Sequence, residues 1–348
     1  MISLDAHFDQ RLPLTHSLMR AVGRLREFRG REELFRRQMP QTLETLRAAA
    51  VIQSTESSNR IEGVVAPHDR IRQLVEKKTT PRDRSEQEIA GYRDVLDIIH
   101  NNYDAMSINS GLIQQLHREL FKYTDEAGGK WKSVANNIVQ FRADGSQVVR
   151  FSPPAPHLTD GLMQSLHDRL DRFRTEQTVD PLLIIAAYVL DFLCIHPFRD
   201  GNGRMARLLT LLLLYQAGYQ VGCFISLETM IENSKESYYD TLYQASQGWT
   251  DGSNTLTPWT EYLLGTFVAA YREFEGRVDL LTNSHGAKTD LVLEAIANTF
   301  GEFTVQDLVR KCPTVSIDLI RLKLKEQKGL GKIECLGRGR NARWRRIG

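Results

Sequence analysis

The residues best suited to chemistry lie in one polar segment, residues 196–207, which reads HPFRDGNGRMAR. This segment separates two strongly apolar stretches, residues 181–195 and 208–215. Pro197 disfavours helical backbone at His196, so we expect a helix to end there and to present the imidazole at the mouth of a loop. Because histidine has a near-neutral ordinary pKa, His196 is a candidate general base for an attacking hydroxyl group.

The following residues of the segment have the composition of a phosphate site. Gly201 and Gly203 allow tight backbone geometry, so that main-chain N–H groups can face inward. A second helix is expected to begin near Asn202, and its N-terminus would add free N–H groups and a positive dipole end. Arg204 and Arg207 lie three positions apart on one helix face and are candidates for binding further phosphate oxygens.

Asp200 completes the pattern as a candidate magnesium ligand. Mg²⁺ usually binds through one or two carboxylates together with substrate phosphates. The segment therefore predicts a site for a polyphosphate and a divalent metal ion. In transfer from a nucleotide, positioning and charge stabilisation do most of the work.

At every fixed position, residues 196–207 resemble the active-site motif of the Fic (filamentation induced by cAMP) family, H-P-F-x-[D/E]-G-N-G-R-x-x-R. The resemblance implies an all-α fold, a Fic-type helical bundle. It also implies an enzyme that transfers AMP from ATP to a Ser, Thr or Tyr hydroxyl of a protein and releases pyrophosphate. ATP would be the substrate and Mg²⁺ the cofactor. The implied roles are general base for His196, magnesium ligand for Asp200, α-phosphate cradle for Asn202 with the Gly201 and Gly203 backbone, β-phosphate contact for Arg204 and γ-phosphate contact for Arg207.

Two further segments resemble parts of the same family. Residues 138–151 contain two β-rich runs around an Asp-Gly pair, which is typical of a β-hairpin. The family has a flap at this place that pairs with an extended segment of the target protein; the alternative is a hairpin that only covers the core. Residues 236–242 are similar to the family's adenine-side helix, so Tyr238 or Tyr239 is a candidate contact for the base, with core packing of one tyrosine as the alternative.

Residues 57–63, SSNRIEG, match the family's inhibitory pattern [S/T]-x-x-x-E-[G/N]. On a helix Ser58 and Glu62 lie one turn apart on the same face, and Gly63 can terminate that helix. A glutamate delivered to Arg207 would occupy the guanidinium that should orient the γ-phosphate, so that ATP would bind in an unproductive pose. The alternative is an ordinary helix end with a solvated glutamate.

The motifs are carried by mostly helical sequence, which we divide into three domains. Residues 1–105 form an N-terminal helical region with the inhibitory pattern, and residues 106–282 form the Fic catalytic core with its small β-hairpin flap. A polar stretch at residues 283–286 marks a linker. Residues 286–348 have the order of a winged helix-turn-helix domain: helices at 290–300, 304–311 and 316–327, then two short strands around a Gly-rich turn.

The composition, with 41% hydrophobic and 25% charged residues over 348 positions, is that of an ordinary globular protein. The longest apolar stretch is interrupted by Asp191 and is too short to span a bilayer. The N-terminus lacks the basic start and apolar core of a secretory signal. We therefore expect a cytoplasmic protein with no membrane partner. Its four cysteines are far apart and are expected to be reduced thiols.

Residues 286–348 carry 13 Lys and Arg against 7 Asp and Glu, although the formal charge of the whole chain is only +2. This basic segment is compatible with DNA binding through phosphate contacts, and equally with protein docking or dimerisation. The residues concerned are Arg321, Lys323 and Lys325 on the last helix and Arg338, Arg340, Arg343, Arg345 and Arg346 around the wing. A homodimer, which is common in the family, would hold the inhibitory helix in place.

Two classes of function remain open. The first is an autoinhibited protein adenylyltransferase that acts on an unknown target protein docked at the flap and on itself. The second is a DNA-binding regulator that uses the nucleotide site as a sensor; the intact His196 favours the enzyme, because a sensor needs no base. Within the enzyme class, another transferred group (UMP, phosphocholine or phosphate) or removal of AMP from a target is also open.

Overall fold

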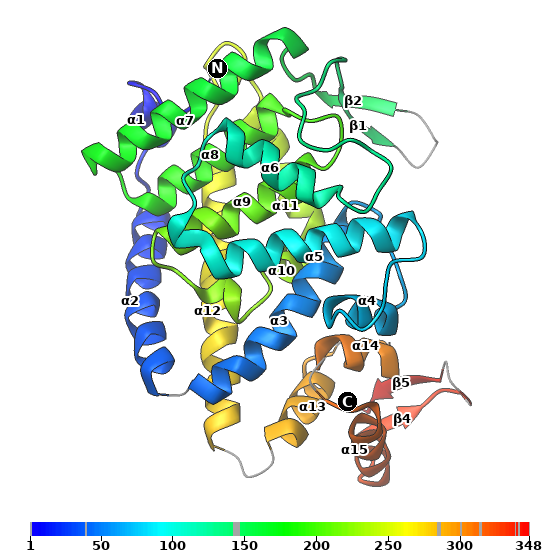
Figure 1. Ribbon diagram of the computed structural model, residues 1–348. Coiled ribbons are helices and arrows are strands. Elements are labelled where there is room, and N and C mark those ends of the chain that lie inside the picture. The colour runs from blue at the N-terminus through cyan, green and yellow to red at the C-terminus, as the bar shows by residue number, and fades with distance from the viewer. Residues whose placement is uncertain are drawn as a thin grey trace.

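The computed structural model describes residues 2–38, 40–141, 147–283, 287–299, 301–312, 315–337, 339 and 342–347. Helices dominate these ranges, and the strands form a two-stranded hairpin and a three-stranded antiparallel sheet (Figure 1). The all-α class predicted from the sequence is confirmed. None of the helices in the described ranges combines the length and the apolar character needed to cross a membrane. All four cysteines are free thiols.

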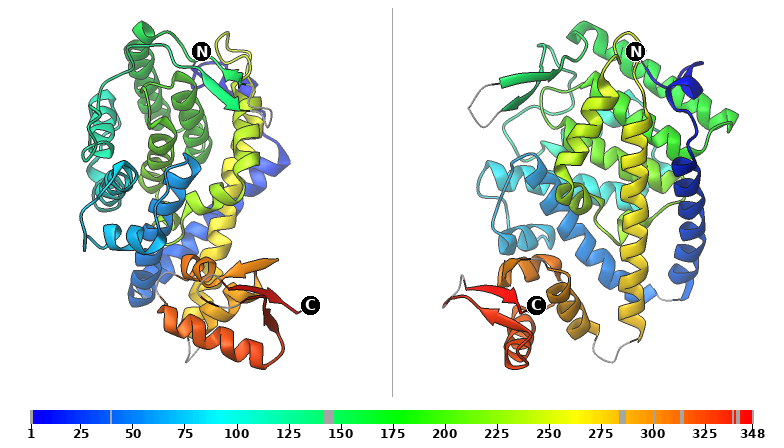
Figure 2. Two further views of the ribbon diagram at one scale, coloured as in Figure 1. Left: turned by 90° about the vertical axis from the view of Figure 1, so that its right-hand side faces the viewer. Right: turned by 180° about the vertical axis from the view of Figure 1, so that it is seen from behind.

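The N-terminal region contains long helices that wrap around one side of the molecule (Figures 1 and 2). Its helices are α1 (Phe8–Arg11), α2 (His16–Gln38), α3 (Pro40–Ile61), α4 (His68–Val75), α5 (Arg84–Asn102) and η1 (Tyr103–Ala105), and α6 (Ser110–Leu120) follows as the first helix of the middle region. Helix α3 packs against α4, α5 and α10 (Leu227–Asn233), and its polar residues from Ser54 to Asn59 are all buried. A helix buried in this way is part of the core although its sequence is largely polar.

The middle of the chain supplies the central helices. Its elements are β1 (Ile138–Phe141), β2 (Gln147–Phe151), η2 (Pro156–Leu158), α7 (Thr159–Glu176), α8 (Pro181–Ile195), α9 (Asn202–Gln216), η3 (Val221–Cys223), α10, α11 (Lys235–Ser246) and α12 (Thr257–Asn283). Helix α8 begins with Asp180 as N-cap, whose side chain accepts from the Leu182 N–H at 2.9 Å. Helices α8 and α9 pack side by side in the main hydrophobic core, and residues 196–201, the first part of the polar segment, form the turn between them.

Asp191, which interrupts the apolar sequence of α8, is fully buried. Its carboxylate accepts hydrogen bonds from the Ser3 backbone N–H, the Ser3 hydroxyl and the Trp249 Nε1, each at 2.7 Å. Burial raises the pKa of Asp191 to about 6 despite these hydrogen bonds. The polar interruption is therefore the point at which the start of the described chain is tied to the core.

The C-terminal unit has its own hydrophobic core. Its elements are α13 (Ala287–Ala297), β3 (Glu302–Thr304), α14 (Val305–Lys311), α15 (Ile317–Gly329), β4 (Ile333–Cys335) and β5 (Arg343–Arg346), with sheet order β3-β5-β4. The three helices and the last two strands lie close to their predicted places. Strand β3 was not predicted, because three residues with one apolar side chain give no alternating pattern. The winged-helix assignment stays a prediction.

The C-terminal unit contacts the helix that carries the inhibitory pattern. Gln53 Nε2 on α3 donates to the backbone oxygen of Arg310 at 3.1 Å, and Arg310 Nε lies 3.4 Å from Glu56 Oε1. In Figure 1, α14 lies directly below α3 and α4. The two parts of the chain thus meet on α3.

Candidate active site

His196 ends helix α8 in a left-handed conformation, with φ +50° and ψ +59°. Its backbone N–H still donates to the Phe192 oxygen at 3.0 Å, which closes the last turn of the helix. The predicted helix end at His196 is confirmed. A following proline favours extended backbone. His196 instead has left-handed backbone, which turns the chain sharply into the loop.

The imidazole of His196 is held as a neutral base. Nδ1 lies 3.3 Å from the Leu193 oxygen, and because a carbonyl only accepts, Nδ1 carries the proton and Nε2 keeps a free lone pair. The pKa of His196 is lowered to about 4, chiefly by burial, and the nearby positive charge of Lys132 contributes to this lowering. At neutral pH the residue can therefore accept a proton.

This pKa makes the pH dependence of catalysis testable. A base acts only when it is unprotonated, so we expect transfer activity to be lost as the pH falls through about 4, the pKa of His196. Between about pH 5 and pH 8 the histidine should contribute no slope. Rates of label incorporation across this range, with circular dichroism at each pH as the folding control, provide the measurement. A decrease centred near 6.5, the ordinary histidine value, would contradict this assignment.

The loop after His196 is shaped by Asn202. Its Oδ1 accepts from the Phe198 N–H at 2.9 Å, and its Nδ2 donates to the Phe198 oxygen at 2.8 Å. The side chain is buried. Asn202, with the Gly201 and Gly203 backbone, was predicted to cradle the α-phosphate, and this stays a prediction; the Asn202 side chain is hydrogen-bonded within the loop. Gly201, with φ +77°, is the residue before the helix.

Asp200 presents its carboxylate to solvent. The side chain is 54% exposed, and Oδ1 accepts from the Gly201 N–H at 2.6 Å. Its backbone oxygen accepts from His117 Nε2 at 3.0 Å, while His117 Nδ1 accepts from the Gly129 N–H at 2.8 Å. The described residues contain no cluster of three or more His, Cys, Asp or Glu suited to a metal. One open carboxylate fits Mg²⁺ that is held mainly by substrate phosphates.

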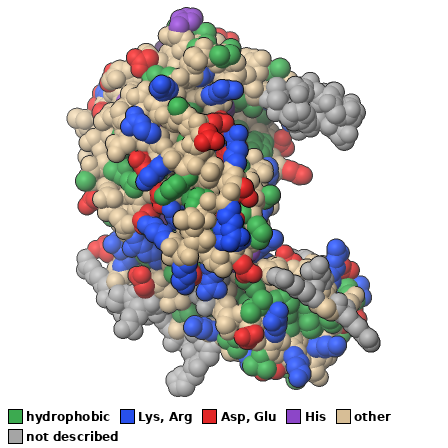
Figure 3. All heavy atoms as spheres, turned by 45° about the vertical axis from the view of Figure 1, so that its right-hand side comes forward, with side chains coloured by type: hydrophobic (Ala, Val, Ile, Leu, Met, Phe, Trp, Pro, Cys, Tyr) green, Lys and Arg blue, Asp and Glu red, His purple; other side chains and the backbone are tan. Residues whose placement is uncertain are grey.

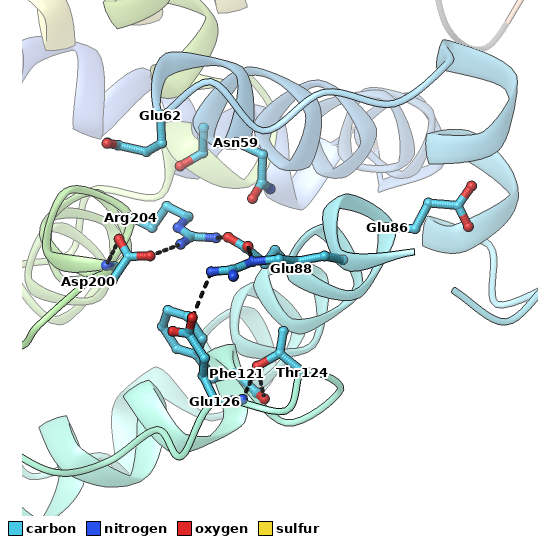
Figure 4. Close-up of polar contacts among 12 residues, drawn as sticks. Asn59, Glu62, Glu86, Glu88, Phe121, Thr124, Glu126, Asp200 and Arg204 are labelled. Atoms are coloured by element: carbon cyan, nitrogen blue, oxygen red, sulfur yellow. Dashed lines mark hydrogen bonds and ion pairs between the residues drawn. The ribbon is translucent and has the colours of Figure 1, made fainter. Parts of the chain in front are cut away.

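Arg204 and Arg207 have different partners, although they lie on neighbouring turns of α9. The Arg204 side chain is almost completely buried; Nη1 lies 2.6 Å from Glu88 Oε2 on α5, and the guanidinium lies over the Phe121 ring at 5.3 Å from its centroid. Figure 4 shows Arg204 between Glu88 and Asp200, whose Oδ2 is 3.8 Å from Arg204 Nη2. A β-phosphate contact for Arg204 stays a prediction, and its observed partners are carboxylates.

Arg207 meets the inhibitory pattern. Its Nε donates to Ser58 Oγ, and its Nη2 donates to the Ser58 backbone oxygen and to Glu62 Oε1, each at 2.8 Å. Within the described part of the chain, Nη1 is buried without a hydrogen-bond partner. Glu62 therefore binds one side of the Arg207 guanidinium, the predicted γ-phosphate contact. The Nη1 group is left as a donor for an incoming oxygen.

Glu62 also lies against the start of α9. A Cβ atom added to Gly203 would be 2.2 Å from Glu62 Oε1, so the carboxylate is in contact with the backbone where a phosphate is expected. Figure 4 draws Glu62 on the same side of the site as Asp200 and Arg204. Helix α3 ends at Ile61, and Gly63 follows with φ +82°, as a helix-terminating glycine does.

The end of α3 is fastened to the elements across from it. Ser57 Oγ lies 2.9 Å from Thr229 Oγ1, and Lys235 Nζ donates to the Ile61 oxygen at 2.7 Å. Arg60 Nη1 forms an ion pair with Glu232 at 2.9 Å. These contacts fix the backbone that delivers Glu62, whose own side chain remains 30% exposed.

The two candidate adenine contacts differ in accessibility. Tyr238 is only 3% exposed and packs edge-on against Trp259 and Tyr262, so it has the core role that the sequence left as the alternative. Tyr239 is 42% exposed and lies beside it, with ring centroids 5.2 Å apart. Tyr239 is the one that can reach a ligand without repacking the core.

The predicted hairpin projects from the body of the molecule beside the site (Figure 1). Strands β1 and β2 pair in antiparallel register, with Val139 opposite Val149 and Gln140 opposite Val148. The Arg150 guanidinium lies 4.6 Å from the centroid of the Tyr243 ring on α11. The predicted turn residues, Asp144 and Gly145, lie outside the described residues.

Sequence reasoning did not single out Glu88, His117 or Lys132. The structure places each against the motif: Glu88 on Arg204, His117 on the Asp200 backbone, and Lys132 on the Ile195 backbone, with Nζ 3.0 Å from the oxygen. Their separations from these partners are 116, 83 and 63 residues. The signal available in the sequence was a polar residue at a buried position on or after an amphipathic helix. Such a residue does not by itself indicate which residue it contacts.

Comparison with known proteins agrees with this geometry. The Fic/DOC family model matches residues 107–214. Protein adenylyltransferase fic-1 of Caenorhabditis elegans is 28% identical over 199 residues, which cover 55% of this chain and 34% of the relative. A probable protein adenylyltransferase of Aquifex aeolicus is 29% identical over 141 residues, covering 40% of this chain and 38% of the relative. In both cases the chain spans less than half the length of its curated relative.

The similarity of fold extends over almost the whole chain. The crystal structure of a Fic family protein from Desulfovibrio desulfuricans superposes with a TM-score of 0.63 and 23% identity, covering 96% of this chain and 97% of that one. Fold and loop together define a Fic-type helical protein with its motif between two buried helices. Residues 107–214 match the Fic/DOC family model, and the chain shares its fold with a Fic family protein.

Proposed function

We propose that the protein is an autoinhibited protein adenylyltransferase. It transfers AMP from ATP to a Ser, Thr or Tyr hydroxyl of a target protein, and of itself, and releases pyrophosphate. The observation that carries the proposal is His196, a neutral base with a free Nε2, in a loop that leads into the N-terminus of α9. The curated relatives named protein adenylyltransferase support the same reaction.

In the proposed reaction the target hydroxyl attacks the α-phosphorus of ATP. His196 Nε2 takes the hydroxyl proton, a bond forms from the hydroxyl oxygen to the α-phosphorus, and the bond to the bridging oxygen of pyrophosphate breaks. The backbone N–H groups at Gly203 and its neighbours stabilise the charge that develops on the α-phosphate oxygens. Arg207, with its unpartnered Nη1, orients the γ-phosphate once Glu62 has left it.

Asp200 would hold magnesium, which when bound neutralises charge on the phosphates. The Asp200→Asn substitution keeps the shape but removes the charge, so we expect the Mg²⁺ concentration for half-maximal activity to rise about tenfold or more. The measurement is a Mg²⁺ titration of AMP transfer by a Glu62→Gly parent. The matched control is Asp168→Asn, an exposed aspartate on α7. An unchanged Mg²⁺ requirement in Asp200→Asn would remove this residue from the metal site.

The decisive test of the proposed reaction compares incorporation of label from α-labelled and γ-labelled ATP. The proteins are wild type, Glu62→Gly and His196→Ala, with self-modification as the default readout. Label from α-labelled ATP only, strongest in Glu62→Gly and absent from His196→Ala, is expected. Label from γ-labelled ATP would indicate phosphate transfer instead. No label from either, with ATP binding intact, would contradict an enzyme of this kind and favour a nucleotide sensor.

The target protein is proposed to dock at the hairpin of residues 138–151. An extended segment of the target would add as a further strand, and main-chain hydrogen bonds would place its hydroxyl without reading much sequence. Support comes from the antiparallel pairing of β1 and β2 and from Val149, which is 52% exposed. The anchoring of the hairpin on Tyr243 keeps the docked strand beside the site.

The C-terminal unit offers less support for DNA binding than its charge suggested. Several of its basic residues have acidic partners within the unit: Arg321 with Asp318, Lys323 with Glu326, Arg343 with Glu302 and Arg345 with Glu334. Figure 3 shows basic and acidic side chains mixed on this unit, next to a group of apolar ones. Arg338 and Arg340 lie outside the described residues. DNA binding and a homodimer stay predictions.

A further inference from the structure

Lys132 is a buried lysine in the loop between α6 and β1. It is 4% exposed, whereas Lys130, two residues earlier, is exposed. Fully buried lysines are rare, because removing an ammonium group from water is costly. Burial lowers the pKa of Lys132 to about 8. An apolar side chain of similar length would fill the same space without this cost, so the position of the ammonium group calls for an explanation.

The contacts of Lys132 surround the candidate base. Its backbone N–H donates to the Pro197 oxygen at 2.8 Å, and its Nζ donates to the Ile195 oxygen at 3.0 Å. The two acceptors are the carbonyls immediately before and after His196. Further along the same loop, Asn136 Nδ2 donates to the Phe198 oxygen at 3.0 Å. The loop therefore runs along the turn and donates hydrogen bonds to three of its carbonyls, those of Ile195, Pro197 and Phe198.

The residue between these carbonyls needs such support. His196 has φ +50°, and left-handed backbone at a residue other than glycine persists only where the surroundings hold it. The direction of its imidazole follows from this backbone, because Nδ1 is bonded to the Leu193 oxygen of the same turn. A change in the carbonyl orientations would change the direction in which Nε2 faces.

We propose that Lys132 is a positioning residue for the transfer reaction. It holds the backbone on both sides of His196 and so fixes Nε2 toward the attacking hydroxyl. The inference rests on the proposed function, and it assigns a task to the loop between α6 and β1. Lys132 touches neither substrate nor the reacting atoms, and it acts through His196.

The positive charge of Lys132 gives this role a measurable signature. Three charged groups act on His196: Lys132 from the loop after α6, Glu62 from the end of α3, and Asp200 from its own loop. Lys132 disfavours a charged imidazole, while the two carboxylates favour it. Loss of the lysine charge should therefore raise the pH at which His196 becomes protonated.

The experiment uses the full chain with Glu62→Gly as parent and adds Lys132→Met, Lys132→Arg or the exposed control Lys130→Met. We expect Lys132→Met to lower kcat about 10- to 100-fold, since small misplacement of a reacting group has effects of this size. Its KM for ATP should stay within about twofold of the parent, because the phosphate residues are unchanged. Lys132→Arg should keep most of the activity, and Lys130→Met should match the parent.

A second readout does not depend on activity. The protonation of His196 can be followed by NMR in protein labelled at histidine, with His196→Ala to assign the signal. In Lys132→Met the midpoint should move to higher pH, and in Lys132→Arg it should stay near that of the parent. If Lys132→Met does not fold, Lys132→Gln, which keeps a donor without the charge, replaces it with the same expected shift.

The outcomes are distinct. A folded Lys132→Met protein with kcat within about twofold of the parent, or with an unshifted His196 midpoint, overturns the proposal. A parent that transfers no group from any nucleotide overturns the proposed function, while the NMR titration still shows whether Lys132 sets the state of His196.

Discussion

The Glu62→Gly variant is expected to transfer AMP at least about 10²-fold faster than the wild-type protein. In the wild type, Glu62 Oε1 lies 2.8 Å from Arg207 Nη2 and in contact with the backbone at Gly203. Both Arg207, the proposed γ-phosphate contact, and the N-terminus of α9 are therefore engaged by a carboxylate. Removing it frees both for ATP, and initial rates of incorporation from α-labelled ATP measure the gain.

A matched control separates this effect from general loosening of α3. Glu232→Gln removes the ion pair with Arg60 on the same helix end but leaves the Glu62 contact with Arg207 in place. It should raise activity far less than Glu62→Gly does. ATP affinity, measured by calorimetry, should change little between wild type and Glu62→Gly, because the expected defect is in the pose. Equal rates for wild type and Glu62→Gly, with ATP bound in both, would eliminate inhibition by Glu62.

Substituting His196 by alanine in the Glu62→Gly parent should lower the rate about 10²- to 10⁴-fold, the usual contribution of a general base. The reason is the loss of Nε2, which has its lone pair free because Nδ1 is bonded to the Leu193 oxygen. ATP binding should persist, since the phosphate contacts belong to α9. Single-turnover rates with α-labelled ATP, together with ATP affinity, provide the measurement.

The control for this variant is His157→Ala, an exposed histidine at η2. It should behave like the parent. If His196→Ala kept more than about a tenth of the parent rate, the proton would have to leave by another route and His196 would not be the base.

The local part of the site could be predicted from the sequence. Pro197 and the two glycines limit the backbone within a few residues, so the helix end at His196 and the helix start at Asn202 follow from short-range sterics. The pairing of Ser58 and Glu62 with one arginine could be anticipated in the same way, because helical spacing places them on one face. The sequence could therefore predict the structure within single segments.

The surroundings of the site could not be predicted, because they depend on which segments meet. Nothing near Arg204 indicates that its guanidinium lies against Glu88 on α5, or that the Asn202 amide is used up within its own loop. The choice between Tyr238 and Tyr239 depends on the position of α12, which buries one ring and leaves the other accessible. Burial of this kind is a property of packing between helices.

The burial of α3 limits how the proposed inhibition by Glu62 can be relieved. Because the residues from Ser54 to Asn59 are inside the core, cutting the chain before Gly63 would remove part of the core together with the inhibitor, and the product would be an unfolded protein and not an active one. At this helix end the Glu62 side chain is 30% exposed, to the same extent as that of Arg60. We therefore expect the proposed inhibition to be relieved on a small scale, by rotation of the Glu62 carboxylate about its own side-chain bonds, with the helix that carries it left in place.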